Sequence, residues 1–165
     1  MKKCYHTSTA LIISGLFLFS CQQENHSSGK VFIGEKIANP IIYEVLAHNP
    51  NPEDDWKTEC LANTDTKTMF TDIIKAVQSG KLKAFDYYDN HQLTNEEVRT
   101  IISKNNFTDR IGKIQFEEEW FWDKANMCLH KKVNKIMLAY ELYDSTGKIR
   151  GYKAGFVVQL NAEHI

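Results

Sequence analysis

Hydrophobic and polar residues alternate in two parts of the chain, as they do in β-strands that bury one face. After Pro40, hydrophobic side chains recur at every second position over residues 41–47. In the C-terminal third, every second residue from 136 to 142 is hydrophobic, the turn-forming sequence DSTGK follows at 144–148, and a second hydrophobic run returns over 149–160. The pattern predicts one strand near the N-terminal side and a β-hairpin in the last third of the chain.

A spacing of three to four residues between hydrophobic positions predicts a helix that starts near Asp65 or Thr66 and ends before Gly80. Asp65 and Thr66 are good N-terminal caps, and Gly80 stands where a helix end favours a left-handed residue. One face of this helix would carry Met69, Phe70, Ile73, Ile74 and Val77.

A second helix is predicted by a capping box, in which Thr94 and Glu97 bond each other's backbone N–H groups. Leu93 and Val98 occupy the staple positions on either side of the cap. The buried stripe of this helix would consist of Val98, Ile101 and Ile102.

Three other segments have weaker patterns. Residues 82–88 indicate a strand between the two helices, and residues 56–62 indicate a short strand. Residues 121–137 fit either a strand or a helical stripe, and periodicity alone does not decide between them. Together the segments predict a single-domain α+β fold, with a mostly antiparallel sheet that ends in a C-terminal β-meander and packs against two helices.

The sequence QFEEEWFWDKANMC (115–128) concentrates acids and aromatics. Read as a strand, it places Phe116, Glu118, Trp120 and Trp122 on one face and the intervening residues on the other. A core strand flanked by solvated acids is one interpretation. A partner-binding role for Trp120, Phe121 and Trp122 is a second, because aromatic residues are enriched at interfaces.

A catalytic role for this stretch would pair two of its three glutamates, Glu117, Glu118 and Glu119, as acid and base. Neighbours on one strand point to opposite faces, so a working pair needs a second element that the sequence does not designate. The motifs G-x-S-x-G, H-E-x-x-H, the P-loop and G-x-G-x-x-G are not present in the sequence. We therefore expect a protein that is not an enzyme.

The first twenty residues have the features of an export signal. Lys2 and Lys3 precede an apolar stretch over 10–20 that is too short to cross a bilayer as a helix. Leu18 and Ser20 then precede Cys21 as in a bacterial lipobox, which predicts cleavage before Cys21 and acylation of its thiol. An ordinary secretory signal or an uncleaved anchor is the alternative. The predicted organisation is a lipoprotein signal peptide (1–20), a tether (21–34) and one α+β domain (35–165).

Composition narrows the classes of partner. The 165-residue chain has a net charge of −1, and its basic residues are scattered, so we expect no nucleic-acid groove. Cys60 and Cys128 would remain in an oxidising compartment, where they either form a disulfide or stay as free thiols. Neither cysteine has a Cys-x-x-Cys partner, and we expect no metal and no cofactor.

Four short segments, GKLKAFD (80–86), EWFWDK (119–124), residues 133–140 and GYKAGFV (151–157), resemble in order and spacing the GldN/PorN family of gliding-motility and type IX secretion proteins. A helix leads into GKLKAFD (80–86), where the family has a G-K-L-x-A-Y-D strand. EWFWDK (119–124), the segment 133–140 and GYKAGFV (151–157) follow in the family's order, and the resemblance covers roughly residues 40–160. Family members are typically longer and not lipidated, and Ala154 and Gly155 replace bulkier residues here.

The resemblance implies a non-enzymatic subunit that forms a periplasmic ring with a lipoprotein partner and contacts the periplasmic part of an energising inner-membrane complex. It also favours strands over a helix for residues 113–142. We therefore expect an outer-membrane lipoprotein that faces the periplasm, binds other secretion or gliding proteins and forms oligomers. Tyr87, Tyr88 and Tyr152 are further interface candidates. The alternative is a ligand-binding lipoprotein, for example for glycans, whose aromatic residues would stack on sugar rings.

Overall fold

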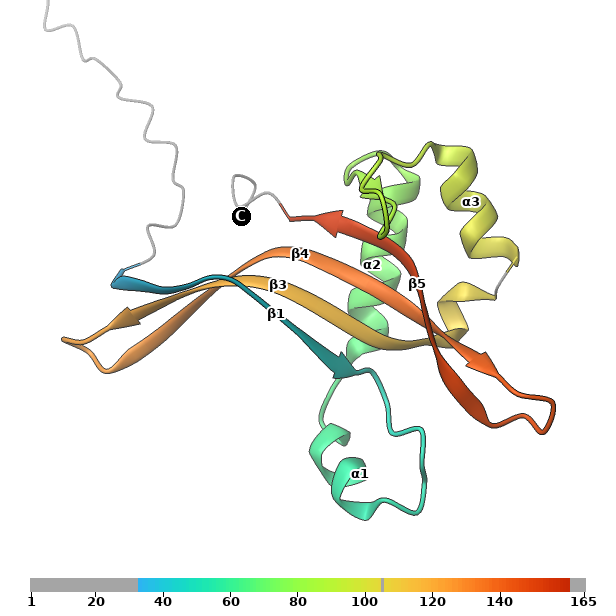
Figure 1. Ribbon diagram of the computed structural model, residues 1–165, viewed down its shortest axis with the longest axis horizontal. Coiled ribbons are helices and arrows are strands. Elements are labelled where there is room, and N and C mark those ends of the chain that lie inside the picture. Colours follow the sequence, from blue (N-terminus) through green and yellow to red (C-terminus); the bar gives the residue numbers. More distant parts are fainter. Residues whose placement is uncertain (1–32, 105, 161–165) are drawn as a thin grey trace, which may run out of the picture.

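A computed structural model describes residues 33–104 and 106–160 of the chain. They form a five-stranded antiparallel sheet with the strand order β1-β3-β4-β5-β2, together with three α-helices, which confirms the predicted α+β class (Figure 1). In chain order the elements are β1 (Glu35–Leu46), α1 (Asp55–Leu61), α2 (Thr66–Gln78), β2 (Ala84–Phe85), α3 (Asn95–Lys104), the 3-10 turn η1 (Phe107–Arg110), β3 (Ile111–Asp123), β4 (Cys128–Tyr143) and β5 (Ile149–Gln159). The predicted signal peptide, Cys21 and most of the predicted tether lie outside the described residues.

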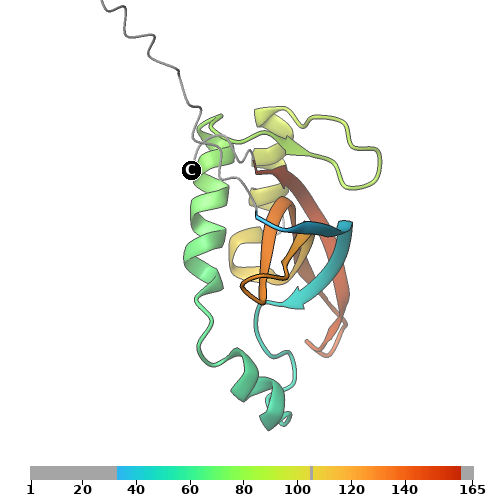
Figure 2. The ribbon, with the colours of Figure 1, turned by 90° about the vertical axis from the view of Figure 1, so that its left-hand side faces the viewer.

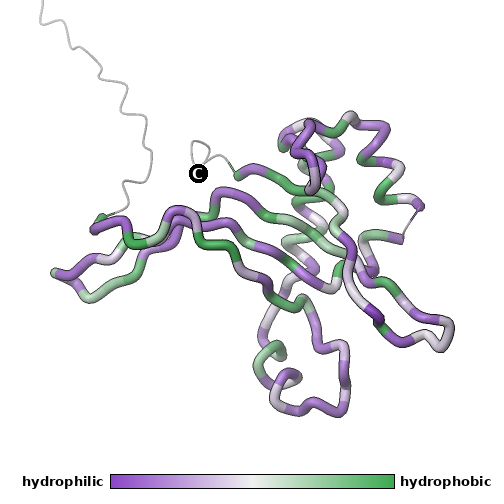
Figure 3. Tube along the Cα trace, in the orientation of Figure 1, coloured by the Kyte–Doolittle hydropathy of each residue, from purple (hydrophilic) through white to green (hydrophobic). Residues whose placement is uncertain are grey.

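The hydrophobic core lies between one face of the sheet and the helices α2 and α3. In Figure 2, α2 stands on one side of the sheet, and the loop that follows β2 projects on the other side. The predicted stripe of α2 is confirmed, because four of its five residues are buried and Met69 packs against them. From the sheet, Leu138, Phe156 and Val158 are fully buried against this stripe. Figure 3 shows hydrophobic segments along the central strands where they cross α2.

Local signals fix both predicted helices. The Asp65 side chain accepts a hydrogen bond from the Thr68 N–H at 3.1 Å, and Gly80 follows the end of α2 with a φ of +77°. At α3, the Thr94 N–H donates to the Glu97 carboxylate at 2.8 Å, and the Glu97 N–H donates to the Thr94 hydroxyl at 3.3 Å. The capping box is therefore confirmed.

The C-terminal hairpin is also confirmed, with β4 and β5 joined by a turn at 144–148. The Asp144 side chain holds this turn, because it accepts hydrogen bonds from the backbone N–H groups of Thr146 and Lys148. Residues 121–137 belong to the strands β3 and β4 and to the turn between them. The helix that their periodicity also allowed does not form, because these residues pair across β3 and β4. The pairing runs from Ile111 opposite Tyr140 to Asp123 opposite Cys128.

Two predicted strands are wrong in type or length. Residues 56–62 fall mostly in the helix α1, because the Asp54 side chain accepts the Lys57 N–H at 3.1 Å and caps a helix there. The strand predicted over 82–88 is reduced to β2. The Asp86 carboxylate accepts the Tyr88 N–H at 2.7 Å, which turns the chain away from the sheet directly after Phe85.

The predicted N-terminal strand is longer than its pattern indicates, since β1 begins at Glu35 and contains Pro40. This proline is tolerated because β1 is an edge strand, where only one side forms backbone hydrogen bonds. None of the described helices combines the length and the hydrophobicity needed to cross a bilayer.

Candidate functional site

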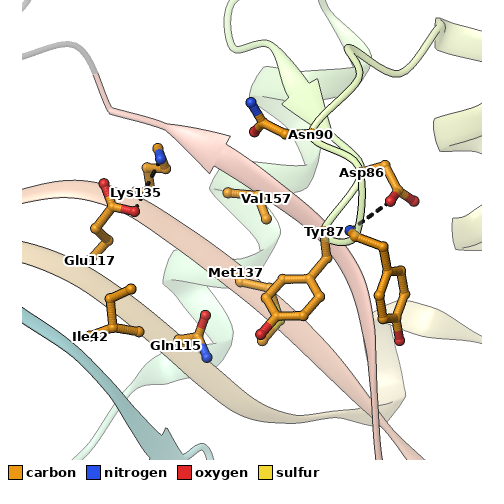
Figure 4. A pocket seen from close by; sticks show the side chains of 10 residues that line it. Ile42, Asp86, Tyr87, Asn90, Gln115, Glu117, Lys135, Met137 and Val157 are labelled. Atoms are coloured by element: carbon orange, nitrogen blue, oxygen red, sulfur yellow. Dashed lines mark hydrogen bonds and ion pairs between the residues drawn. The ribbon is translucent and has the colours of Figure 1, made fainter.

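An open groove lies on the face of the sheet opposite α2, beneath the loop that follows β2. It encloses about 370 Å³. Figure 4 shows Tyr87 on one side of the groove and the pair Glu117 and Lys135 on the other. The lining side chains come from four strands and one loop: Ile42, Asp86, Tyr87, Tyr88, Asn90, Gln115, Glu117, Lys135, Met137 and Val157.

Residues 86–91, which we call the tyrosine loop, are held in shape mainly by their own backbone and side chains. The Asp86 N–H donates to the His91 carbonyl at 2.9 Å, and the Asp86 carboxylate accepts the N–H groups of Tyr88 and Asp89. Tyr87 and Tyr88 contact each other edge to face with 5.3 Å between the ring centroids. The loop therefore presents two aromatic rings as one unit, and the Tyr88 ring remains 75% exposed.

The floor of the groove combines hydrophobic and charged groups. Met137 is buried between the strands, and Val157 lies directly opposite it on β5. The Lys135 ammonium donates to the Glu117 carboxylate at 3.0 Å across β3 and β4. The far rim is formed by Ile42 of β1, whose side chain is exposed. Such a surface can hold a ligand or a peptide that offers both an apolar face and hydrogen-bonding groups.

Three side chains of the tyrosine loop lie close enough to one another to hold a cation. Asp86, Asp89 and His91 each offer one ligand atom, and these atoms lie within 4.8 Å of one another. The sequence analysis grouped no metal ligands, because their spacing matches no known pattern and only the tight loop brings them together. These groups also serve the loop itself: the Asp89 carboxylate lies 2.6 Å from His91 Nδ1 and raises the pKa of His91 above its ordinary value.

The predicted aromatic interface residues of β3 lie outside the groove. Trp120 and Trp122 are half-buried on the face predicted for them, and Phe121 lies on the opposite face. The Lys131 ammonium lies 4.6 Å from the centre of the Trp120 ring, and the Lys36 ammonium lies 5.4 Å from that of Phe121. The structure therefore brings Tyr87 and Tyr88 together at the groove and leaves the β3 aromatics in a separate surface.

The three glutamates of β3 do not converge on a common point. Glu117 pairs with Lys135 in the groove, whereas Glu118 points to the other face and accepts hydrogen bonds from Tyr43 and Trp120. Glu119 bonds Lys36 at 2.8 Å, and this contact lowers its pKa. Each carboxylate is thus occupied by a structural partner of its own.

Tyr152 belongs to a further cluster, which the sequence analysis did not find. It surrounds the buried carboxylate of Glu141, which lies 2.7 Å from His48 Nε2 and accepts a hydrogen bond from the Tyr143 hydroxyl. Burial and the neighbouring Glu141 charge raise the pKa of Tyr152. A side chain at Gly112 would overlap both Glu141 and Tyr152, so glycine permits their close approach. Nothing in the local sequence around Glu141 indicated these partners.

Cys60 and Cys128 are both exposed free thiols, so the disulfide considered from the sequence is not formed. Cys60 lies in α1, and Cys128 begins β4 at the far end of the β3–β4 hairpin, which projects away from α1 (Figure 1).

Fold and groove together define an α+β protein whose antiparallel sheet is covered by helices on one face and carries an aromatic groove on the other. No protein-family model matches the chain, and no curated protein matches it.

Proposed function

We propose that this chain is a non-enzymatic lipoprotein of the cell envelope, which binds another protein of a type IX secretion or gliding assembly through its groove. The lipidation predicted at Cys21 and the resemblance in residues 40–160 support the compartment and the assembly. The groove supports the binding role, and the observation that carries it is the pair Tyr87 and Tyr88, in edge-to-face contact at the side of an open groove.

The groove has the composition of a protein-binding surface. Tyrosine rings supply a large contact area at a small cost in side-chain entropy, and they are among the residues that contribute most to binding energy. On the side of the groove away from Tyr87, the pair Glu117 and Lys135 offers both signs of charge to a partner (Figure 4). In this proposal the protein lies on the periplasmic side of the outer membrane. Its partners are a ring lipoprotein and the periplasmic part of the energising complex, and it forms oligomers with them.

Copurification tests this proposal. A C-terminally tagged copy is expressed at its native level, extracted in mild detergent and identified with its partners by mass spectrometry. Recovery of secretion or gliding components is expected for the natural chain. The double variant Tyr87→Ala, Tyr88→Ala is expected to lose most of this recovery, since a central tyrosine at an interface contributes about 1–2 kcal/mol or more.

Trp56→Ala is the matched control, because Trp56 is a 71% exposed aromatic residue on α1, away from the groove. It should recover the same partners as the natural chain. If the natural chain is recovered without any envelope protein, the assembly role is wrong. If the double tyrosine variant recovers the same partners as the natural chain, the groove is not the binding surface.

Glycan binding is a second candidate function, favoured by one feature of the groove. The Tyr87 and Tyr88 rings stand beside Asp86, Asn90 and Gln115, and aromatic faces flanked by carboxylates and amides suit a sugar ring. Screening the purified protein against a glycan array tests it. Binding that is abolished by Tyr87→Ala and kept by Trp56→Ala would favour this function over the assembly role.

A further inference from the structure

Exposed hydrophobic side chains gather at one end of the molecule. The start of β1 and the distal end of the β3–β4 hairpin, residues 33–37 and 122–130, lie together, and we call this region the hairpin tip (Figure 1). Nine large hydrophobic side chains are exposed among the described residues, and four of these are in the tip: Ile33, Ile37, Met127 and Leu129. Met127 is 73% exposed and Ile33 is 61% exposed.

Strand pairing brings the start of β1 beside the distal end of the β3–β4 hairpin. Trp122 lies opposite Glu35 of β1 on one side and opposite Leu129 of β4 on the other. Gly34 is packed directly against the backbone of Trp122, so the preceding residue, Ile33, also lies near the hairpin. Figure 3 shows hydrophobic segments both at the start of β1 and on the β4 side of the hairpin turn.

Both acids of the tip, Asp123 and Glu35, have partners within it. The Asp123 carboxylate accepts hydrogen bonds from the N–H groups of Ala125 and Asn126 and from the Asn126 side chain. The Lys124 ammonium lies 3.3 Å from the Glu35 carboxylate. A surface that inserts into a bilayer interface needs this property, because unpaired polar groups are costly to desolvate.

The position of the predicted lipid anchor indicates what covers the tip. Cys21 precedes Ile33 by twelve residues, and twelve residues span at most about 40 Å even when fully extended. The chain thus enters the domain at the tip and at no other end, so an acyl group on Cys21 keeps the tip close to its membrane. Lys36 and Lys124 belong to the tip, and Lys131 and Lys132 follow it on β4. Each of them has a carboxylate partner, and their stems can lie along an apolar surface with the ammonium groups at the level of the headgroups.

We infer that the hairpin tip inserts shallowly into the lipid bilayer that anchors Cys21. Ile33, Met127 and Leu129 reach the boundary between headgroups and acyl chains, and they act as a second membrane signal beside the covalent lipid. The inserted tip orients the domain, with its groove held away from the bilayer. This inference rests on the lipid anchoring in the proposed function, and it extends that function from attachment to orientation.

The two free cysteines provide the test. A polarity-sensitive fluorophore is attached to Cys128 at the tip in the variant Cys60→Ser, and to Cys60 on α1 in the variant Cys128→Ser. Each purified lipoprotein is reconstituted into phosphatidylcholine vesicles that contain lipids brominated on their acyl chains. We expect bromolipid quenching several-fold stronger at Cys128 than at Cys60. Equal quenching at both positions, or none at Cys128, would overturn the inference.

A second measurement separates the tip from the anchor. Mass spectrometry of the N-terminal peptide shows whether Cys21 is acylated, independently of the tip. In addition, the mature chain with Cys21→Ser is sedimented with phosphatidylcholine vesicles, with and without the changes Met127→Glu and Leu129→Glu. Trp56→Glu is the control, since Trp56 is about as exposed as Met127 and lies on α1, away from the tip.

We expect the two tip changes to reduce vesicle binding several-fold and the control to leave it unchanged. If Cys21 is acylated but tip and control changes have the same effect, the anchor stands and the inserted tip is wrong. If Cys21 carries no lipid but the tip changes still reduce binding, the lipid anchor is wrong and the tip retains its own affinity for membranes.

Discussion

Glu118 is a buried acid at the centre of the aromatic surface on β3. Glu118 is only 3% exposed, and its carboxylate accepts hydrogen bonds from the Tyr43 hydroxyl at 2.8 Å and from the Trp120 indole at 2.7 Å. Lys131 lies 3.8 Å away. Burial and the bond to Glu118 raise the pKa of Tyr43 to about 12, so the hydroxyl stays protonated and donates throughout the physiological range.

We predict that Glu118→Ala lowers the free energy of unfolding by about 2–3 kcal/mol, because it leaves two donors and a lysine without their acceptor. Urea unfolding followed by tryptophan fluorescence measures the change. Glu44→Ala is the control: Glu44 forms an exposed ion pair with Lys113, and its loss should cost less than about 1 kcal/mol. Equal effects of the two changes would show that the Glu118 network does not stabilise the fold.

The pH dependence of the tyrosine loop follows from His91 and Asp89. The bond to Asp89 raises the pKa of His91 above 6.5; desolvation opposes this shift, and the charges of Asp89, Glu97 and Asp86 add to it. The bonds to His91 lower the pKa of Asp89 below 3.8. Both members of the His91–Asp89 ion pair are therefore charged between about pH 4 and 6.5. The ion pair is lost as the pH rises through the raised pKa of His91, or falls through the lowered pKa of Asp89.

We predict that Asp89→Asn returns the pKa of His91 towards its ordinary value, because the first and largest cause of the shift disappears. A titration of the His91 ring protons by NMR measures both values. Asp72→Asn, an acid on α2 outside the loop, is the control and should leave the titration unchanged. An unchanged pKa in Asp89→Asn would mean that the contact does not persist in solution.

Sequence patterns were informative about side-chain direction and uninformative about distant partners. Alternation placed Glu118 on the apolar face of its strand, as the structure has it. However, its partner Tyr43 is 75 residues away, and only strand pairing brings the two together. Tyr87 and Tyr88 were predicted as interface residues, yet the groove beneath them depends on Lys135 and Glu117 from strands that no local pattern connects to the loop.

At the scale of elements, β5 shows how packing against a neighbouring element limits the size of a side chain in a strand. Gly155 is buried beneath the ring of Phe107 in η1, and a side chain at this position would overlap that ring. Phe107 is fully buried and contacts the rings of Tyr140 and Phe156. The small residue noticed in the sequence at 155 thus has a packing explanation, since the phenylalanine occupies the space of a larger side chain.

We predict that Gly155→Ala lowers the free energy of unfolding by about 1–3 kcal/mol, because Phe107 must move within a close-packed core. Gly151→Ala is the matched control on the same strand, where an added methyl group would meet no atom within 4 Å. It should change stability by less than about 0.5 kcal/mol. Thermal or urea unfolding compares the two, and similar losses would mean that β5 disfavours any side chain irrespective of Phe107.

Elements whose start and end are encoded by nearby residues were predictable from the sequence. Segments in which a side-chain cap or turn overrides a weak strand pattern were not. The capping box of α3 and the turn of the β4–β5 hairpin are encoded within a few residues, so the sequence identified both. Hydrophobic and polar residues alternate only weakly over residues 56–62, and the N-terminal cap formed by Asp54 stabilises a helix there instead of a strand. At β2 the side chain of Asp86 ended a strand that the hydrophobic pattern alone would have continued.

For the molecule as a whole, the sheet divides into a part covered by helices and a hairpin that projects beyond them. Ile114, Leu138 and Val158 belong to the buried core, whereas Trp120 and Lys131 lie on the projecting part and are at least partly exposed. Figure 1 shows that only β1 accompanies the hairpin to its tip. Fewer buried side chains must therefore be exposed to open the hairpin than to unfold the core.

We predict that amides of the projecting hairpin exchange with solvent roughly tenfold faster or more than those of the covered sheet, which corresponds to an opening free energy lower by about 1.4 kcal/mol. Native-state hydrogen exchange at Trp120 and Lys131, compared with Leu138 and Val158, measures the difference. Adding vesicles to the lipidated protein should slow exchange at the hairpin and leave the covered sheet unchanged, since insertion of the tip stabilises only the closed hairpin. Equal exchange in both parts would instead mean that the hairpin opens only when the whole domain unfolds, and the tip would then be a rigid extension of the core.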